Sequence, residues 1–382
     1  MSSSEPEFND AREYSSLEEV MNTLLTAKGK SFRELDQTGR ALTGGNKGSL
    51  GQIIEESVLK YAINSDAAPD IHIGDTSYEL KVTPLKHIKK GKQTSAKERL
   101  VIDIINYLTL ADETDFESSK MWDKAKNIIL VYYYDDRTDK KKELRIDCKV
   151  LASYLMKYEA DDLATIKNDW HVIRDKVASG HADSLSESDT NYLAACTKGA
   201  NSKQLREAPA PAGANTATIF AKQRAFSLKT SYMTAIARKL LNRKSETVRL
   251  PIPQEQNLDE YVAAKFIPYT GKSSRDIASE LQVSAAPTAK NYNSSLAFAM
   301  LGASKSSISK IEQFSKANIS QFKSVTIYPD GLPREHMSFK AITDDQWEEW
   351  ANPQTTWEQS FVRDFGSARV FAHFGLRPSP WR

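Results

Sequence analysis

Two acidic residues and a lysine stand close together in PDIHIGDTSYELKVTPL (residues 69–85), where Asp70 lies nine positions ahead of Glu79, Leu80 and Lys81. Side chains of a strand alternate between its faces, so Glu79 and Lys81 share one face while Leu80 points into a core. Two carboxylates and the main-chain carbonyl of Leu80 are hard oxygen ligands, the kind that Mg²⁺ accepts. The spacing therefore indicates a magnesium site at which Lys81 could orient an attacking water against a phosphodiester.

The same spacing also fits an ordinary amphipathic strand, because Asp, a gap and Glu-x-Lys occur by chance in many proteins. Glu55, in GSLGQIIEE, adds a third acid on a segment expected to be helical, and Ile53 and Ile54 mark the buried side of that helix. A helix-borne acid could complete the metal site. A surface carboxylate of the helix is the alternative.

Several helices and strands must position these side chains. Asp70 opens a short strand that is expected to return antiparallel and bring its carboxylate beside Glu79. A capping box at Ser16 and Glu19 predicts the first helix. Strands are expected in IHI, SYELKVTPL, RLVIDIINYLTL and NIILVYYY; helices over 16–28, from about 49, near 148–178 and over 231–244; and loop-rich chain over 179–216.

Composition limits the class of protein. The 382 residues suggest two domains, and 40% hydrophobic with 27% charged residues is typical of a globular chain. No apolar run reaches the length of a membrane span, and no signal peptide opens the sequence. Two cysteines are too few for a disulfide framework, so a cytoplasmic location is expected. Because the net charge is only +2, any affinity for DNA must come from local basic runs such as KHIKKGK (86–92). Such a run is also typical of an ordinary solvated loop.

An internal repeat divides the chain. GKSFREL (29–35) recurs as GKSSRDI (271–277), and SYELKVTPL recurs as ISQFKSVTI (319–327), both at an offset of 242 positions. NKGSLGQIIEESVL is answered between them by NYNSSLAFAMLGAS. With a break at RLPIPQEQN (249–257), the repeat predicts domains at 1–250 and 251–382, the second a truncated copy of the first.

The second copy lacks the acids of the first. Gln321 replaces the glutamate of the triplet, although Lys323 keeps the lysine, and only Glu312 stands at the offset of Asp70. One carboxylate cannot hold the metal as two or three do, so residues 251–382 are expected to bind DNA, regulate or dimerise rather than cut. Basic residues that could bind DNA there, or merely aid solubility, are Lys305, Lys310 and Lys316.

KGSLGQIIEESVL followed by PDIHIGDTSYELKVTPL resembles MutH, the nicking endonuclease of methyl-directed mismatch repair, and the GATC-cutting type II restriction endonucleases related to it. SAKERLVIDIINY (95–107) looks like the restriction-enzyme branch, and KQRAFSLKTSYMTAIARKLL (222–241) resembles an element of both branches. The resemblance covers nearly all of residues 15–245. It implies an α/β fold of the PD-(D/E)xK nuclease type, in which helices flank a mixed central sheet, followed here by the pseudo-nuclease copy.

Carried onto this sequence, the resemblance makes Asp70 and Glu79 magnesium ligands and Lys81 the catalytic lysine that positions or activates water. Glu55 becomes the helix-borne acid. Lys124, in DKAKNIIL, matches a lysine that contributes to activity in the family, although a surface lysine at the start of a strand is the alternative.

DNA recognition in MutH comes from a loop and a C-terminal element that reach the major groove. The matching segments here are TKGANSKQLREAPAPA and FSLKTSY. Lysine and arginine commonly contact guanine edges. The spacing of the loop departs from MutH, so a phosphate contact is equally open for its arginine. The residues expected to contact DNA are Lys198, Arg206, Lys229 and, as a weaker candidate, Tyr232.

Together these features predict a Mg²⁺-dependent type II restriction endonuclease that cuts double-stranded DNA at GATC or a related site. Cutting both strands of a palindrome calls for a dimer on DNA. The resemblance also implies a cognate methyltransferase in the same system. Two alternatives stay open: a MutH-type nicking endonuclease of mismatch repair, and a non-cleaving DNA-binding protein with a nuclease fold.

Overall fold

The computed structural model describes residues 13–39, 49–61, 71–88, 93–138, 143–199, 204–241, 247–303 and 308–319. It divides the chain into two compact units. The first consists of residues up to 103, 114–157 and 236–243, and the second of residues 104–113, 158–235 and 244 onward. The predicted boundary at 250 therefore falls inside the second unit. Compact units do not test whether one segment is a duplicate of another, so the assignment of 251–382 as a second copy stays a prediction.

A five-stranded mixed sheet forms the centre of the first unit. Its order is β1-β2-β5-β6, and β3 pairs with the C-terminal part of β2. β2 runs parallel to β5, with Glu79 opposite Ile128, whereas the other neighbours are antiparallel. The predicted mixed sheet with flanking helices is thereby confirmed. Its strands are β1 (Ile71–Ile73), β2 (Thr76–Ile88), β3 (Gln93–Ala96), β5 (Ile128–Tyr134) and β6 (Val150–Leu155), while β4 (Leu100–Ile104) lies outside it.

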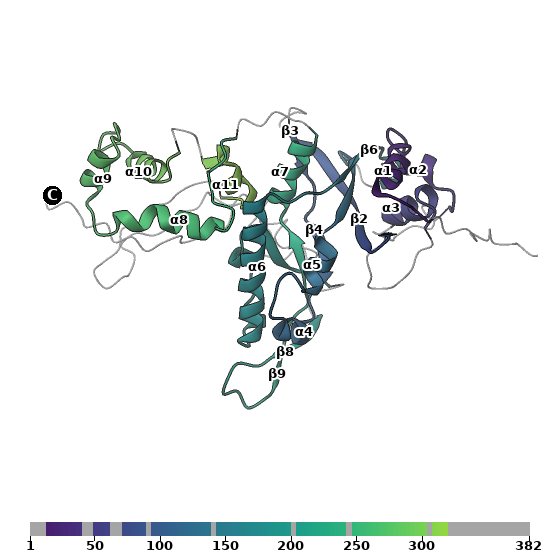
Figure 1. Cartoon of the computed structure of the whole chain (residues 1–382), viewed down its shortest axis with the longest axis horizontal. Coiled ribbons are helices and arrows are strands. Elements are labelled where there is room, and N and C mark those ends of the chain that lie inside the picture. Colours follow the sequence, from purple (N-terminus) through teal and green to yellow (C-terminus); the bar gives the residue numbers. More distant parts are fainter. Residues whose placement is uncertain are drawn as a thin grey trace, which may run out of the picture. The chain divides into compact units, whose positions relative to one another are not determined.

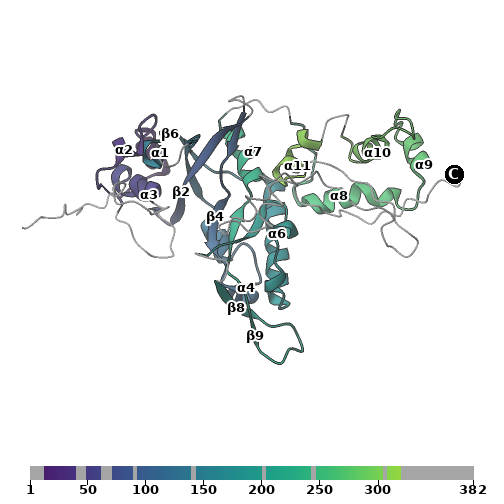
Figure 2. The same cartoon turned by 180° about the vertical axis from the view of Figure 1, so that it is seen from behind.

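N-terminal helices cover one face of this sheet, as Figures 1 and 2 show for α1, α2 and α3 beside β6 and β2. Leu80 is buried there in one apolar cluster with Ile129 and Val131 of β5 and with helix residues. Leu80 therefore anchors β2 as predicted, and Glu79 and Lys81 point to the opposite face. The helices are α1 (Leu17–Leu25), α2 (Phe32–Leu35), α3 (Ser49–Gln52) and the π-helical turn η2 (Ile53–Val58), followed later by α5 (Lys120–Ala125) and η3 (Arg145–Asp147).

Helix α6 (Ala160–Ala178) organises the second unit through buried acids. The Asp169 carboxylate accepts backbone N–H groups of Asn191, Tyr192 and Leu193 at 2.6, 2.6 and 2.9 Å, which fixes the start of β7 against the helix. β7 (Leu193–Thr197) pairs antiparallel with β10 (Arg224–Leu228), and β8 (Leu205–Pro209) with β9 (Thr218–Lys222). The remaining helices are α4 (Tyr107–Asp112), η4 (Ala182–Ser184), η5 (Glu187–Asp189), α7 (Thr230–Leu240), α8 (Leu258–Phe266), η6 (Ile267–Tyr269), α9 (Ser274–Glu280), α10 (Tyr292–Met300), η7 (Ile308–Lys310) and α11 (Glu312–Lys316), with the end of α7 in the first unit.

The segment that follows α7 is tied to α6 by a buried ion pair. Lys316 Nζ of α11 lies 2.8 and 2.6 Å from the two carboxylate oxygens of Asp162, and the side chains are 2% and 0% exposed. Gln313 bonds the Asp161 carboxylate at 3.2 Å and both backbone groups of Leu250. The expectation that Lys316 binds DNA or aids solubility at the surface is therefore wrong, because its side chain is buried against the Asp162 carboxylate. Lys305 lies outside the described residues.

The predicted repeat can be compared in the structure at two helix starts, and the second copy itself stays a prediction. α8, α9 and α10 follow one another as α1, α2 and the α3–η2 helix do. Gly29 and Gly271, 242 positions apart, both take positive φ, 82° and 79°. Two residues after each glycine, Ser31 and Ser273 accept the backbone N–H of the third helical residue at 3.2 and 3.1 Å. These matched helix starts support the prediction of a second copy, whose counterpart of the Glu79 strand lies outside the described residues.

Some predicted elements are wrong. Residues 107–112 form a helix instead of extending a strand, because Asn106 accepts the Thr109 N–H at 3.3 Å and caps it. Residues 150–155 are strand β6 instead of helix, paired with β5. β7 and β8 lie in the region expected to be loop, and Pro209 ends β8 where its missing N–H is tolerated. Within the described ranges, none of the helices has the length and apolar character that crossing a membrane requires.

Candidate active site

β2 brings Glu79 and Lys81 together on one face. Lys81 Nζ lies 2.5 Å from Glu79 Oε1, with the glutamate side chain 8% exposed and the lysine 25%. Glu79 is also fixed by its backbone, since its N–H donates to Asn127 O at 2.9 Å. The lysine thus reaches solvent beside a shielded carboxylate, an arrangement that can hold a cation and an anionic substrate next to each other.

Asp70 lies outside the described residues. Its neighbour Ile71 lies opposite Tyr78, the neighbour of Glu79, in the antiparallel β1–β2 pair. Glu55 is described and half-buried on the π-helical turn η2, a conformation that is frequent at functional sites. Gly51 faces it, because a Cβ added at Gly51 would lie 3.6 Å from Glu55 Oε1.

The donors fit Mg²⁺ by their chemistry. The Glu79 carboxylate is a hard oxygen ligand, and few other ligands would be needed because Mg²⁺ keeps several waters. Among the residues that the structure describes, no group of three or more His, Cys, Asp or Glu side chains is gathered as a metal site. The described part of the site therefore supplies one carboxylate on β2, and the second predicted ligand, Asp70, stays a prediction.

Lys124 lies at a junction that is bonded to β2. It belongs to the last turn of α5, and Asn127, three residues later, donates through Nδ2 to Ser77 O at 3.1 Å as well as accepting from Glu79. Lys124 Nζ is 3.0 Å from Asp103 Oδ1. Asp103 was not predicted, although a single acid within the apolar strand LVIDI was a visible signal in the sequence.

Two of the residues predicted to contact DNA, Lys198 and Arg206, are both hydrogen-bonded to Gln223. The Lys198 N–H donates to Gln223 O at 2.9 Å, and Arg206 Nε donates to Gln223 Oε1 at 2.8 Å. Arg206 is exposed on β8, in the hairpin that lies beside α4 in Figure 1. Both side chains stay candidates for contact with DNA.

The other two candidates are buried. Lys229 is 8% exposed, and its Nζ donates to Thr190 O at 2.5 Å. Tyr232 is 0% exposed, with its hydroxyl 3.3 Å from Asp162 Oδ2. Burial raises the pKa of Tyr232 well above its usual value. These positions are at odds with direct DNA contact in this conformation. Tyr232 instead joins α7 to α6, and Lys229 joins the residue before α7 to Thr190, which lies between η5 and β7.

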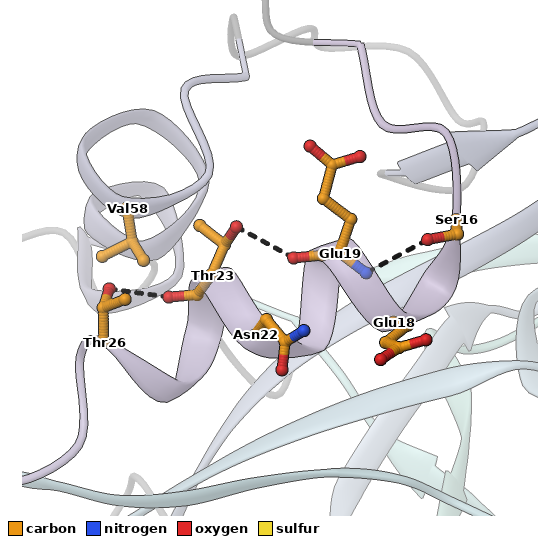
Figure 3. Close-up of a pocket in the computed structure, with 7 residues that line it drawn as sticks. All are labelled: Ser16, Glu18, Glu19, Asn22, Thr23, Thr26 and Val58. Carbon is orange, nitrogen blue, oxygen red and sulfur yellow. Dashed lines mark hydrogen bonds between the residues drawn. The ribbon is translucent and has the colours of Figure 1, made fainter.

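A polar hollow runs along α1 (Figure 3). Some of its side chains bond the backbone of the helix itself: Ser16 accepts the Glu19 N–H at 3.2 Å, and Thr23 donates to Glu19 O at 2.9 Å. None of the predicted site residues lines it. The lining residues are Ser16, Glu18, Glu19, Asn22, Thr23, Thr26 and Val58.

Comparison with known proteins identifies the family. Over 355 residues the chain is 36% identical to the type II restriction enzyme Sau3AI of Staphylococcus aureus, an alignment that spans 91% of this chain and 68% of the relative. The chain belongs to the Sau3AI family. Its likeness to MutH is confirmed as well, because the family model of the DNA mismatch repair enzyme MutH matches residues 59–169.

The residues that match the MutH model include strands β1, β2 and β5 of the candidate site. They also include Glu79, Lys81 and Lys124. The DNA mismatch repair protein MutH of Shewanella woodyi is 26% identical over 225 residues, or 58% of this chain and 90% of the relative. The MutH protein of Shewanella sp. strain MR-7 is 26% identical over 197 residues, or 51% of this chain and 80% of the relative. The Sau3AI alignment therefore extends well beyond the part shared with MutH.

Proposed function

We propose that the protein is a Mg²⁺-dependent type II restriction endonuclease with a PD-(D/E)xK nuclease core, which hydrolyses double-stranded DNA at GATC or a closely related site. The observation that carries the proposal is the pairing of Glu79 with Lys81 on one face of β2 while Leu80 is buried behind them. The pairing occurs in a chain of the Sau3AI family.

In this proposal Glu79, Asp70 and the Leu80 carbonyl hold the ion. When bound, Mg²⁺ supplies Lewis-acid chemistry, lowering the pKa of a water and stabilising charge on the phosphate. Lys81 holds the attacking water and places a positive charge beside the phosphate, where negative charge grows. Glu55 and Lys124 help to place water and phosphate.

DNA recognition is assigned to Lys198 and Arg206, which reach solvent from the segment around Gln223. Arginine offers a planar fork that matches guanine edges, whereas a lysine contributes a point charge. A dimer on DNA would present two sites to the two strands, and a methyltransferase would protect the host sequence. A cytoplasmic location stays a prediction from the sequence.

Supercoiled plasmid grown with and without GATC methylation tests the proposal. We expect linear product and then fragments in Mg²⁺, none in excess EDTA, and mapped ends at GATC. Lys81→Ala should lower the cleavage rate at least about 100-fold, since a positioned acid–base or charged group contributes about 10²–10⁴. Lys149→Ala changes an exposed lysine directly before β6; this matched control should cleave normally. Full Mg²⁺-dependent cleavage by Lys81→Ala would show that the assignment is wrong.

A second candidate is a nicking endonuclease of the MutH type, which the match of residues 59–169 to the MutH model favours. The same digest separates the two functions. Linear product without added proteins supports the restriction enzyme, whereas open circles that never become linear support the nicking enzyme.

A further inference from the structure

Lys124 is held by a carboxylate from another element. Its Nζ lies 3.0 Å from Asp103 Oδ1 of β4, and the contact is both a hydrogen bond and an ion pair. The lysine side chain is 18% exposed and the aspartate 29%. A pair shielded to this degree is screened less by salt than an exposed pair, so its geometry is better defined.

The backbone beneath Lys124 is already fixed relative to the candidate site. α5 ends at Ala125, and Asn127 is bonded to β2 through both its carbonyl and its amide. β5 then begins at Ile128, opposite Glu79. What these contacts leave free is the long side chain of Lys124, whose four-carbon stem has many rotamers. The hydrogen bond to the Asp103 carboxylate restricts those rotamers.

We infer that Asp103 is a positioning residue that holds the Lys124 ammonium group in place for its part in the reaction at Glu79 and Lys81. The inference rests on the proposed function, in which Lys124 takes part in cleavage. Asp103 acts through Lys124 and need not touch DNA. Its removal should therefore slow the chemical step without weakening DNA binding.

The test compares Asp103→Asn, Lys124→Ala and the double variant. Single-turnover cleavage of a GATC duplex is measured in Mg²⁺ with the protein in excess, and affinity for the same duplex is measured in EDTA. We expect Asp103→Asn to cleave about tenfold more slowly, with affinity and Tm close to the wild type, because a hydrogen bond to a charged group is lost. Adding Asp103→Asn to Lys124→Ala should slow cleavage no further, since the two residues act as a unit.

A matched control lies on the same helix. Asp123→Asn removes the partner of Lys126, a 2.6 Å pair whose side chains are 57% and 41% exposed, and should leave the cleavage rate unchanged. Asp103→Glu keeps a carboxylate and should recover most of the rate, which a purely steric role of Asp103 would not produce.

Three results would overturn the inference while leaving the proposed function standing. These are a wild-type rate for Asp103→Asn, a wild-type rate for Lys124→Ala, and a further loss when Asp103→Asn is added to Lys124→Ala. A wild-type protein that cuts no DNA would instead overturn the proposed function, and the inference with it.

Discussion

Lys316→Met is expected to destabilise the second compact unit strongly. At an effective dielectric constant of about 20, charges 2.6 Å apart attract by about 6 kcal/mol, which offsets a desolvation cost of several kcal/mol for each ion. Methionine keeps the aliphatic volume of Lys316 but leaves the Asp162 carboxylate buried without that attraction. The free energy of unfolding should therefore fall by about 3–5 kcal/mol.

The loss can be measured by thermal and urea unfolding at pH 7. For a unit of this size it corresponds to a fall in Tm of about 10 °C. Burial raises the pKa of Asp162, and Lys316 opposes that rise. In Lys316→Met the pKa should rise further, so the deficit should shrink as the pH falls and the carboxyl group becomes neutral.

Two further variants make the prediction specific. Lys310→Met changes an exposed lysine in the neighbouring η7 and should alter stability by no more than about 0.5 kcal/mol. Asp162→Asn added to Lys316→Met removes the buried charge and keeps an acceptor for the Tyr232 hydroxyl, so it should restore part of the loss. If Lys316→Met melts within about 1 °C of the wild type, or if the double variant is less stable still, the reasoning is refuted.

Two other predictions concern charge. Glu79→Gln should slow Mg²⁺-dependent cleavage about 100-fold while affinity for DNA in EDTA is kept, because a neutral amide is a poor magnesium ligand; unchanged cleavage would remove Glu79 from the site. Burial of Asp135 favours its neutral form, but hydrogen bonds from Arg137 and Lys97 outweigh burial and hold the pKa of Asp135 well below its usual value. Such a carboxylate stabilises the fold above its unfolded pKa and loses that contribution as the pH falls through the folded pKa. Asp135→Asn should therefore cost about 2–3 kcal/mol at pH 7 and progressively less below about pH 4, measured by urea unfolding at several pH values.

The strand that carries the candidate site could be predicted because its pattern is local. Alternation alone places Leu80 in the core and Glu79 beside Lys81, and the structure has both. Cap chemistry is local as well, and the helix beginning at Leu17 was found from Ser16. Family likeness then supplied Lys124, which no spacing rule would select.

Long-range pairing could not be read from the sequence. Val150–Leu155 has apolar residues that suit a helix, and only its ladder with β5 makes it a strand. Lys316 looks like any surface lysine until the fold places it over Asp162, 154 positions away. Likewise, tyrosine is a residue type that can contact DNA, but Tyr232 is buried because α6 and α11 pack against it. No local pattern in the sequence predicts that packing.

The π-helical turn at Ile53–Val58 has a consequence for Glu55. Leu59 N–H reaches back five residues to Ile54 O at 2.9 Å, so this turn contains one residue more than an α-helical turn. Each residue of an α-helix advances the chain by about 100° around its axis. Deleting one residue from this turn, even a residue with no role in the chemistry, would rotate the part of the helix that carries Glu55 by about that angle relative to the rest of the helix. The direction of the Glu55 carboxylate therefore depends on the number of residues in this turn.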